Sequence, residues 1–238
     1  MALRRFAILH LLAALLLISW LFTPTRALWN SLDQVGFQFF NGFVQSSPFW
    51  QKFWAQANYK SSEWMMDIVR LIFFGCFLLI GAQHERKVRL AKILTTIIFL
   101  VFSILVICKT VFHNLLDIER FGPTACDETA FRLSKVIDWI YVKDHSLSSF
   151  PSDHGITACA FIGSMFALFG VRYGLVAIIT EGYYCMPRLV TGAHWPSDIL
   201  VGSTSVALIL CAWFYATPLS AFIINLLTFG KKDAPSTV

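Results

Sequence analysis

The chain has 238 residues, of which 57% are hydrophobic, 16% aromatic and only 14% charged. Soluble globular proteins carry roughly 25% charged residues, so this composition excludes an ordinary soluble domain, and also a disordered chain or a coiled coil. A polytopic membrane protein remains, because six spans of about 20 residues would use roughly half of the chain. The formal net charge of +5 is modest, so the placement of the basic residues matters more than their number.

Six apolar runs predict six membrane-spanning helices, at residues 6–22, 64–82, 93–112, 156–171, 173–190 and 199–216. The first run is long for the core of a signal peptide, which favours an uncleaved helix, although residues 25–27 loosely resemble a cleavage site. The second run contains Asp67 and Arg70, one helical turn apart and able to pair. Glu181 in the fifth run is tolerated only if that helix packs inside a bundle.

Residues 24–63 indicate an amphipathic helix at the membrane surface. Apolar residues recur there at helical spacing, with Asn, Asp and Gln between them: Leu28, Leu32, Val35, Phe39 and Phe43. Trp29, Trp50 and Trp54 suit the boundary between water and lipid. Two interpretations stay open, a helix that caps the bundle and a wall that guides a lipid substrate sideways.

The basic residues orient these helices. With the N-terminus in the cytoplasm, the basic residues on that side lie in short flanks and loops: Arg4, Arg5, Arg86, Lys87, Arg89, Lys92, Arg172, Lys231 and Lys232. Those on the other side are diluted along longer segments and mixed with most of the acids, so the positive-inside rule is satisfied. We therefore predict an all-α, six-helix membrane domain at residues 1–230, and a short cytoplasmic tail at residues 231–238.

Two short stretches concentrate the reactive side chains. Phe-Pro-Ser-Asp-His-Gly, at residues 150–155, comes directly before the fourth span. Arg-Leu-Val-Thr-Gly-Ala-His-Trp-Pro-Ser-Asp, at residues 188–198, comes before the sixth. Two helices separate the stretches, so both return to the same outer face of the membrane.

These side chains suit phosphoryl transfer. Asp198 can accept a proton from one imidazole nitrogen of His194 and leave the other nitrogen free as a nucleophile. Arg188 can clamp phosphate oxygens, and His154 can protonate a departing oxygen. Ser152 is predicted to be the N-cap of the fourth helix, whose free N–H groups also favour an anion.

Taken singly, each of these residues has a structural explanation. An interfacial histidine is often only hydrogen-bonded, an arginine only a topology determinant, a serine only a helix cap and an aspartate only a helix-start charge. Their combination, in this order and on one face, favours the catalytic interpretation. The stretches contain no cluster of carboxylates that would suit a magnesium ion, so we expect neither a metal nor a cofactor.

The two stretches resemble the type 2 phosphatidic acid phosphatase (PAP2) superfamily. Its pattern is Lys-x6-Arg-Pro, then Pro-Ser-x-His, then Ser-Arg-x5-His-x3-Asp. The second element matches fully at residues 151–154. The third matches at Arg188, His194 and Asp198, with Pro187 in place of the serine.

The resemblance implies a six-helix fold and metal-independent transfer through a phosphohistidine. By motif position, His194 is the expected nucleophile, Asp198 its orienting partner and His154 the general acid. Arg188 is expected to bind the phosphate, with Ser152 beside it.

The first element of the family pattern is degenerate in this chain. Arg120-Phe-Gly-Pro123 resembles its Arg-Pro end with two residues inserted. His113 stands seven residues before Arg120, at the position that a lysine occupies in the family pattern. The resemblance carries phosphate binding over to Arg120. Lys143, eight residues before Pro151, either supplies the missing charge or is a solvated loop lysine.

The runs at residues 149–155 and 187–195 resemble more closely the bacterial lipid A 1-diphosphate synthases. This resemblance implies transfer of a phosphate from undecaprenyl diphosphate to the 1-phosphate of lipid A, at the periplasmic face of the inner membrane. If water is the acceptor, the enzyme is a plain polyprenyl-diphosphate or phospholipid phosphatase. Six spans disfavour the related vanadate-dependent haloperoxidases, and no sequence feature indicates nucleic acid as a partner.

A hypothesis from another class is a non-catalytic lipid transporter or scaffold. The degenerate first element supports it. The joint presence of His154, His194 and Asp198 opposes it, because lipid passage alone does not require a proton relay.

Overall fold

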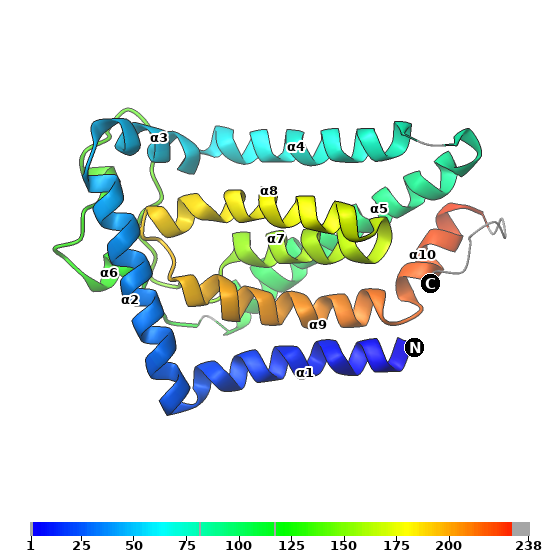
Figure 1. Ribbon diagram of the computed structural model, residues 1–238, viewed down its shortest axis with the longest axis horizontal. Coiled ribbons are helices and arrows are strands. Elements are labelled where there is room, and N and C mark those ends of the chain that lie inside the picture. The colour runs from blue at the N-terminus through cyan, green and yellow to red at the C-terminus, as the bar shows by residue number, and fades with distance from the viewer. Residues whose placement is uncertain (1, 81, 117, 230–238) are drawn as a thin grey trace.

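The computed structural model describes residues 2–80, 82–116 and 118–229, and within these ranges the chain is helical and has no strands (Figure 1). The expected all-α fold class is therefore confirmed. The predicted tail at residues 231–238 lies outside the described residues.

Each of the six predicted spans coincides with a helix. In chain order the helical elements are α1 (Ala2–Leu21), α2 (Thr23–Gln45), α3 (Pro48–Asn58), α4 (Lys60–Leu79), η1 (Gln83–Glu85), α5 (Arg86–Phe102), η2 (Ser103–Leu116), α6 (Pro123–Cys126), η3 (Leu133–Lys135), α7 (Asp153–Ser164), η4 (Met165–Phe169), α8 (Val171–Val190), η5 (Asp198–Ser203), α9 (Thr204–Tyr215) and α10 (Leu219–Leu227). The elements η2, η4 and η5 have π-helical hydrogen bonding and continue α5 and α7 or lead into α9.

Three of the described helices are long and apolar enough to cross a membrane. They are Ala2–Leu21, Gln83–Leu116 and Asp198–Tyr215, while the apolar helix Asp153–Phe169 is shorter. The helices α4 and α8 carry charged side chains along their length, which lowers their hydropathy. Six membrane crossings therefore stay a prediction.

The long helices lie lengthwise in one bundle, and α2 crosses one end of it (Figure 1). The described start of α1 lies at the opposite end, near α10. At the end that α2 covers, α7 begins at Asp153, α8 ends at Val190 and η5 begins at Asp198. The bundle thus brings the two reactive stretches to the same end, as their order in the sequence predicts.

The surface segment predicted at residues 24–63 forms two helices and the first turn of α4. Ser47 accepts a hydrogen bond from the backbone N–H of Phe49 and starts α3, with Pro48 in the first turn. The apolar positions of α2 identified from the sequence largely point away from the protein, since Leu28 and Phe39 are 71% and 67% exposed. The opposite face of α2 is buried on the bundle and includes Asp33.

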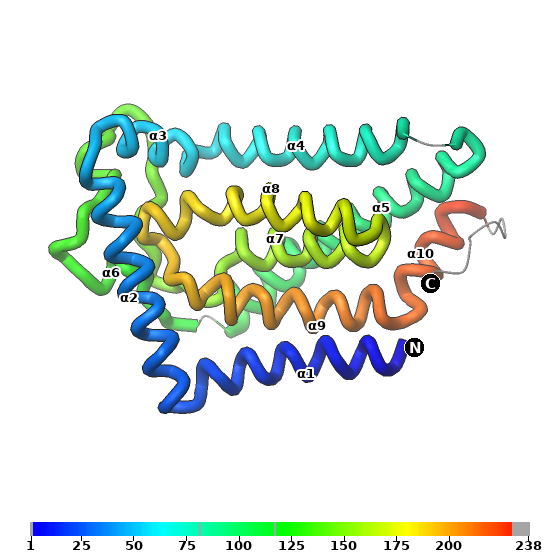
Figure 2. The backbone as a smooth tube through the Cα atoms, viewed as in Figure 1, coloured from blue at the N-terminus to red at the C-terminus, as the bar shows by residue number. Residues whose placement is uncertain are grey.

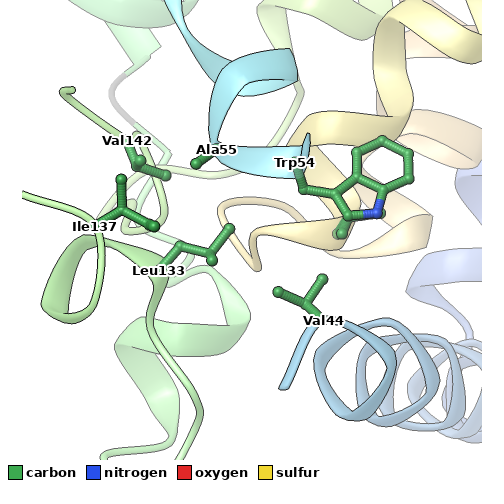
Figure 3. Close-up of a cluster of buried hydrophobic side chains, with 7 residues drawn as sticks. Val44, Trp54, Ala55, Leu133, Ile137 and Val142 are labelled. Carbon is green, nitrogen blue, oxygen red and sulfur yellow. The ribbon is translucent and has the colours of Figure 1, made fainter. Parts of the chain in front are cut away.

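A cluster of buried apolar side chains fixes α2 and α3 to the long connection between η2 and α7 (Figure 3). It consists of Val44, Trp54, Ala55, Leu133, Ile137, Val142 and Val190. Trp54 is 8% exposed in this cluster, so protein rather than lipid covers it, and its predicted depth at the water–lipid boundary stays a prediction. The backbone trace shows the connection lying beside α2 and α3 at this end of the bundle (Figure 2).

A buried ion pair joins α4 to α8. The guanidinium of Arg70 donates to both carboxylate oxygens of Glu181, at 2.9 Å and 2.5 Å, and the carboxylate is fully buried. The predicted pairing of Arg70 with Asp67 is also present, at 3.0 Å, with an exposed Asp67 side chain. Packing inside the bundle, predicted for Glu181, is confirmed.

Replacing Glu181 by alanine leaves Arg70 buried without its main partner. We expect the free energy of unfolding to fall by about 3 kcal/mol, the cost of breaking a buried ion pair from one side. Thermal unfolding in detergent measures the change. Asp67→Ala is the control, because its exposed pair with Arg70 contributes less than about 1 kcal/mol. Equal effects of the two substitutions would show that the buried pair does not stabilise the bundle.

Candidate active site

Local helix signals position the two reactive stretches. The Ser152 hydroxyl accepts a hydrogen bond from the N–H of Gly155, at 3.3 Å, so its predicted role as the N-cap of α7 is confirmed. In the second stretch Gly192 has a φ of +79°, and a Cβ there would lie 2.5 Å from the Cγ2 atom of Thr124. Only glycine fits this turn, which leads from the end of α8 to His194.

Hydrogen bonding sets the tautomer of His194. Its Nδ1 atom lies 2.8 Å from the carbonyl oxygen of Ser149, and the imidazole is buried. A carbonyl oxygen only accepts, so Nδ1 carries the proton and Nε2 keeps its lone pair. Among the described residues, Nε2 has no hydrogen-bond partner. The imidazole is therefore in the form that a nitrogen nucleophile requires.

The carboxylate of Asp198 stands beside this imidazole without a hydrogen bond to it. The Oδ2 atom is 3.6 Å from Nδ1, beyond hydrogen-bond distance, and accepts instead from the backbone N–H of Trp195 at 2.7 Å. The Oδ1 atom pairs with Arg120. The negative charge of Asp198 thus lies close to His194, while the carbonyl of Ser149 accepts the hydrogen bond that orients the ring.

Arg120 belongs to a buried cluster behind Asp198. Its guanidinium pairs with Asp198 and, at 2.8 Å, with Asp33 of α2. Its Cζ atom also lies 5.3 Å and 5.7 Å from the ring centroids of Trp20 and Phe150, which stack on one another. The guanidinium also donates to the Ser197 hydroxyl at 3.0 Å, so Arg120 contacts carboxylates, a hydroxyl and aromatic rings, and its predicted binding of phosphate stays a prediction.

Asp33 connects this cluster to the second stretch directly. Its two carboxylate oxygens accept from the backbone N–H of Ser197 at 2.8 Å and from the Ser197 hydroxyl at 2.6 Å. Asp33 is 3% exposed. The transverse helix α2 thus holds the turn that follows His194.

The second group of reactive side chains surrounds Arg188. Its Nη2 atom lies 3.0 Å from Nε2 of His154 and 2.5 Å from Oε1 of Glu63. The same Glu63 oxygen is 3.1 Å from Nε2 of His154. A guanidinium, an imidazole and a carboxylate therefore meet at one point, and together they line a pocket with Met65, Met66 and Tyr183.

Asn58, the last residue of α3, holds this group in place. Its Oδ1 atom accepts from Arg188 at 3.2 Å and from the backbone N–H of Lys143 at 2.8 Å. Its Nδ2 atom donates to the carbonyl of Lys143 and to the hydroxyl of Thr191. The Lys143 side chain is partly exposed, and partial burial together with the Arg188 charge lowers its pKa.

The predicted residues thus form two neighbouring groups at one end of the bundle, and the backbone N–H of His194 donates to the carbonyl of Arg188 at 3.2 Å. Ser152 and Lys143 lie beside them, and Arg120 lies behind Asp198. Sequence reasoning missed four contributors: Asp33, Asn58, Glu63 and Ser149. Two of them could have been identified from the sequence as candidate site residues. Asp33 is an acid inside an amphipathic helix, and Glu63 is an acid at the start of an apolar run.

Comparison with known proteins shows the family. The model of the PAP2 superfamily matches residues 123–222. The chain is 30% identical over 229 residues to lipid A 1-diphosphate synthase of Escherichia coli (strain K12), covering 96% of this chain and 92% of that protein. It is also 39% identical over 69 residues to lipid A 1-phosphatase of Rhizobium johnstonii, covering 29% of this chain and 26% of that protein. No solved structure matches the chain.

The apolar helical bundle holds two histidines and a buried arginine at one end, a set of side chains suited to phosphate transfer. The chain belongs to the PAP2 superfamily. It is an enzyme, a lipid phosphatase or phosphotransferase, so the hypothesis of a non-catalytic transporter or scaffold is set aside.

Replacing Asp33 by asparagine removes the buried charge that Arg120 and Ser197 contact. We expect kcat to fall about tenfold or more, because the turn that positions His194 shifts. The free energy of unfolding is expected to fall by about 3 kcal/mol, since Arg120 stays buried with one partner fewer. Turnover and thermal unfolding in detergent measure the two effects.

The matched control is Asp127→Asn, which changes an exposed acid of the connecting loop. It is expected to alter neither quantity measurably. Parent-like turnover of the Asp33 variant would contradict the role of α2 in positioning the site.

Proposed function

We propose that the protein transfers the distal phosphate of a lipid diphosphate through a phosphohistidine at His194. The hydrogen bond from Nδ1 to the carbonyl of Ser149 carries this proposal, because it leaves the Nε2 lone pair available. In the first step Nε2 attacks the distal phosphorus, and the bond from phosphorus to the bridging oxygen breaks. His154 donates a proton to that departing oxygen, which stays on the lipid monophosphate.

The second step regenerates the enzyme. An acceptor oxygen attacks the phosphorus, the bond from phosphorus to Nε2 breaks, and His154 takes up a proton from the acceptor if the acceptor carries one. Arg188 and the N–H groups at the start of α7, capped by Ser152, stabilise the phosphate charge. Asp198 stabilises the positive charge that His194 gains, and Arg120 holds Asp198 in position. Lys143 adds positive charge at the solvent-exposed edge of the site.

We assign undecaprenyl diphosphate as the donor and the 1-phosphate of lipid A as the acceptor. The relative that spans nearly the whole chain is named lipid A 1-diphosphate synthase, and the shared length supports a shared reaction. The second candidate is hydrolysis, with water as the acceptor. It is supported by the higher local identity to lipid A 1-phosphatases, 39% and 40% over 69 and 57 residues.

The site is proposed to open on the periplasmic side of the inner membrane, through six crossings. The basic residues of the predicted cytoplasmic side include Arg86 and Lys87, at the start of α5, and Arg172, at the start of α8. These positions are at the end of the bundle opposite the site (Figure 1). The positive-inside rule then directs the site outward.

Incubating the purified protein with undecaprenyl diphosphate labelled at its distal phosphate, with and without lipid A, tests the reaction. We expect labelled lipid A when lipid A is present, and the same result in excess EDTA, because Arg188 supplies the positive charge. Free labelled phosphate alone would favour hydrolysis. Loss of turnover in EDTA that magnesium restores would contradict the metal-independent mechanism.

The variant His194→Gln keeps a polar side chain of similar size and removes the nucleophile. Turnover should fall at least about 1,000-fold, equivalent to about 4 kcal/mol of transition-state stabilisation. His145→Gln is the matched control, because His145 is an exposed histidine of the connecting loop. Activity of the His194 variant within about threefold of the parent would refute the phosphohistidine.

Cysteine labelling tests the sidedness. In a background with the native cysteines replaced, Tyr141→Cys places a thiol at a residue that is 76% exposed at the site end, and Gln83→Cys places one at the opposite end. A membrane-impermeant thiol reagent added to intact spheroplasts should label the first variant, and label the second only after lysis. The reversed pattern would show that the site faces the cytoplasm.

A further inference from the structure

Glu63 lies where a phosphate oxygen of the proposed substrate would bind. One of its carboxylate oxygens contacts Arg188 at 2.5 Å and His154 at 3.1 Å, and these two groups are themselves 3.0 Å apart. The proposed reaction needs the same Arg188 for the phosphate and the same His154 for the departing oxygen. A carboxylate and a phosphate carry charge of the same sign, so they cannot both occupy this position.

The three side chains differ in how firmly they are held. Arg188 has a side chain only 6% exposed and is also bonded to Asn58, whereas the Glu63 side chain is 35% exposed. Glu63 is in the first turn of α4, next to the extended residue Tyr59 that separates α3 from α4. The backbone at the start of α4 is held by hydrogen bonds between Ser61, Ser62 and Gln56 of α3, and the Arg70–Glu181 ion pair holds the helix further along, so only the Glu63 side chain has to move. Glu63 can therefore turn toward solvent while Arg188 stays in place.

Apolar side chains surround the same point. Met65, Met66 and Tyr183 line the pocket that contains Glu63, His154 and Arg188. A phosphate attached to a hydrocarbon chain gains binding free energy from such contacts, and inorganic phosphate gains none.

We propose that Glu63 occupies the anion site of the substrate-free enzyme and adds the same displacement cost to every phosphate, so that only a phosphate with apolar contacts binds tightly. This inference rests on the proposed function, because it takes Arg188 as the phosphate ligand. A lipid phosphate displaces the carboxylate with the help of its apolar contacts. Inorganic phosphate has to displace Glu63 without that help, so it binds weakly although it carries the same charged group.

The test is the binding of inorganic phosphate to the full-length protein in detergent, measured by calorimetry. Glu63→Gln should bind phosphate roughly tenfold more tightly than the parent, because a neutral amide competes less well for Arg188 than a carboxylate. The double variant Glu63→Gln/Arg188→Gln should lose this gain. Glu63→Asp, with a shorter side chain that withdraws the carboxylate from Arg188, should show a smaller gain and provides a second test.

Asp67→Asn is the matched control. It removes the same charge from the same helix one turn further along, where Asp67 contacts Arg70. Its phosphate affinity should change by less than about twofold, because the charge is exposed and screened. Phosphate binding by the Glu63→Gln variant that is no tighter than that of the Asp67 variant would overturn the proposal.

Turnover of the lipid diphosphate separates the two proposals. The Glu63→Gln variant should show stronger inhibition by inorganic phosphate, with a lower KM for the lipid, because both ligands displace the same carboxylate. A gain in phosphate binding in a protein that does not turn over the lipid would refute the proposed function alone. Normal turnover of the lipid with unchanged phosphate inhibition would refute the role of Glu63 alone.

Discussion

The guanidinium of Arg120, between the buried carboxylates of Asp33 and Asp198, is the contact on which the rest of the site depends. A carboxylate removed from water is costly unless a cation and hydrogen-bond donors surround it, and this cluster supplies both. Asp33 belongs to α2, and Asp198 opens η5 directly after His194. The same electrostatic cluster therefore seats the transverse helix on the bundle and sets the turn that carries His194, the proposed nucleophile.

The two groups of the site differ in rigidity, and the difference suits the roles proposed for them in phosphate transfer. His194 has a single tautomer, because the main-chain carbonyl of Ser149 fixes one nitrogen and Asp198 is held by buried partners. Around Arg188, the partner Glu63 is partly exposed and lies at the start of a helix. A nucleophile must be held in one orientation, whereas an anion site must release its occupant when the substrate arrives.

Local sequence signals explain most of what could be predicted. Helix periodicity and hydropathy located the long helices, and the cap at Ser152 followed from a single residue type before an apolar run. The order of the helices was enough to bring His154, Arg188 and His194 to one end of the bundle. The sequence did not predict that Trp54 is buried, since the segments that cover it lie about 80 residues away along the chain.

By itself, the sequence determined the all-helical membrane class, the two reactive stretches and the family to which their spacing belongs. Only the tertiary structure decided the partners of those residues. It placed Arg120 between two carboxylates, gave His194 a carbonyl in place of a carboxylate as its hydrogen-bond acceptor, and brought Glu63 to Arg188. These pairs join residues from 45 to 125 positions apart. A motif records residue types at short spacing, while buried polar groups select partners by distance and charge in the folded chain, which short spacing does not encode.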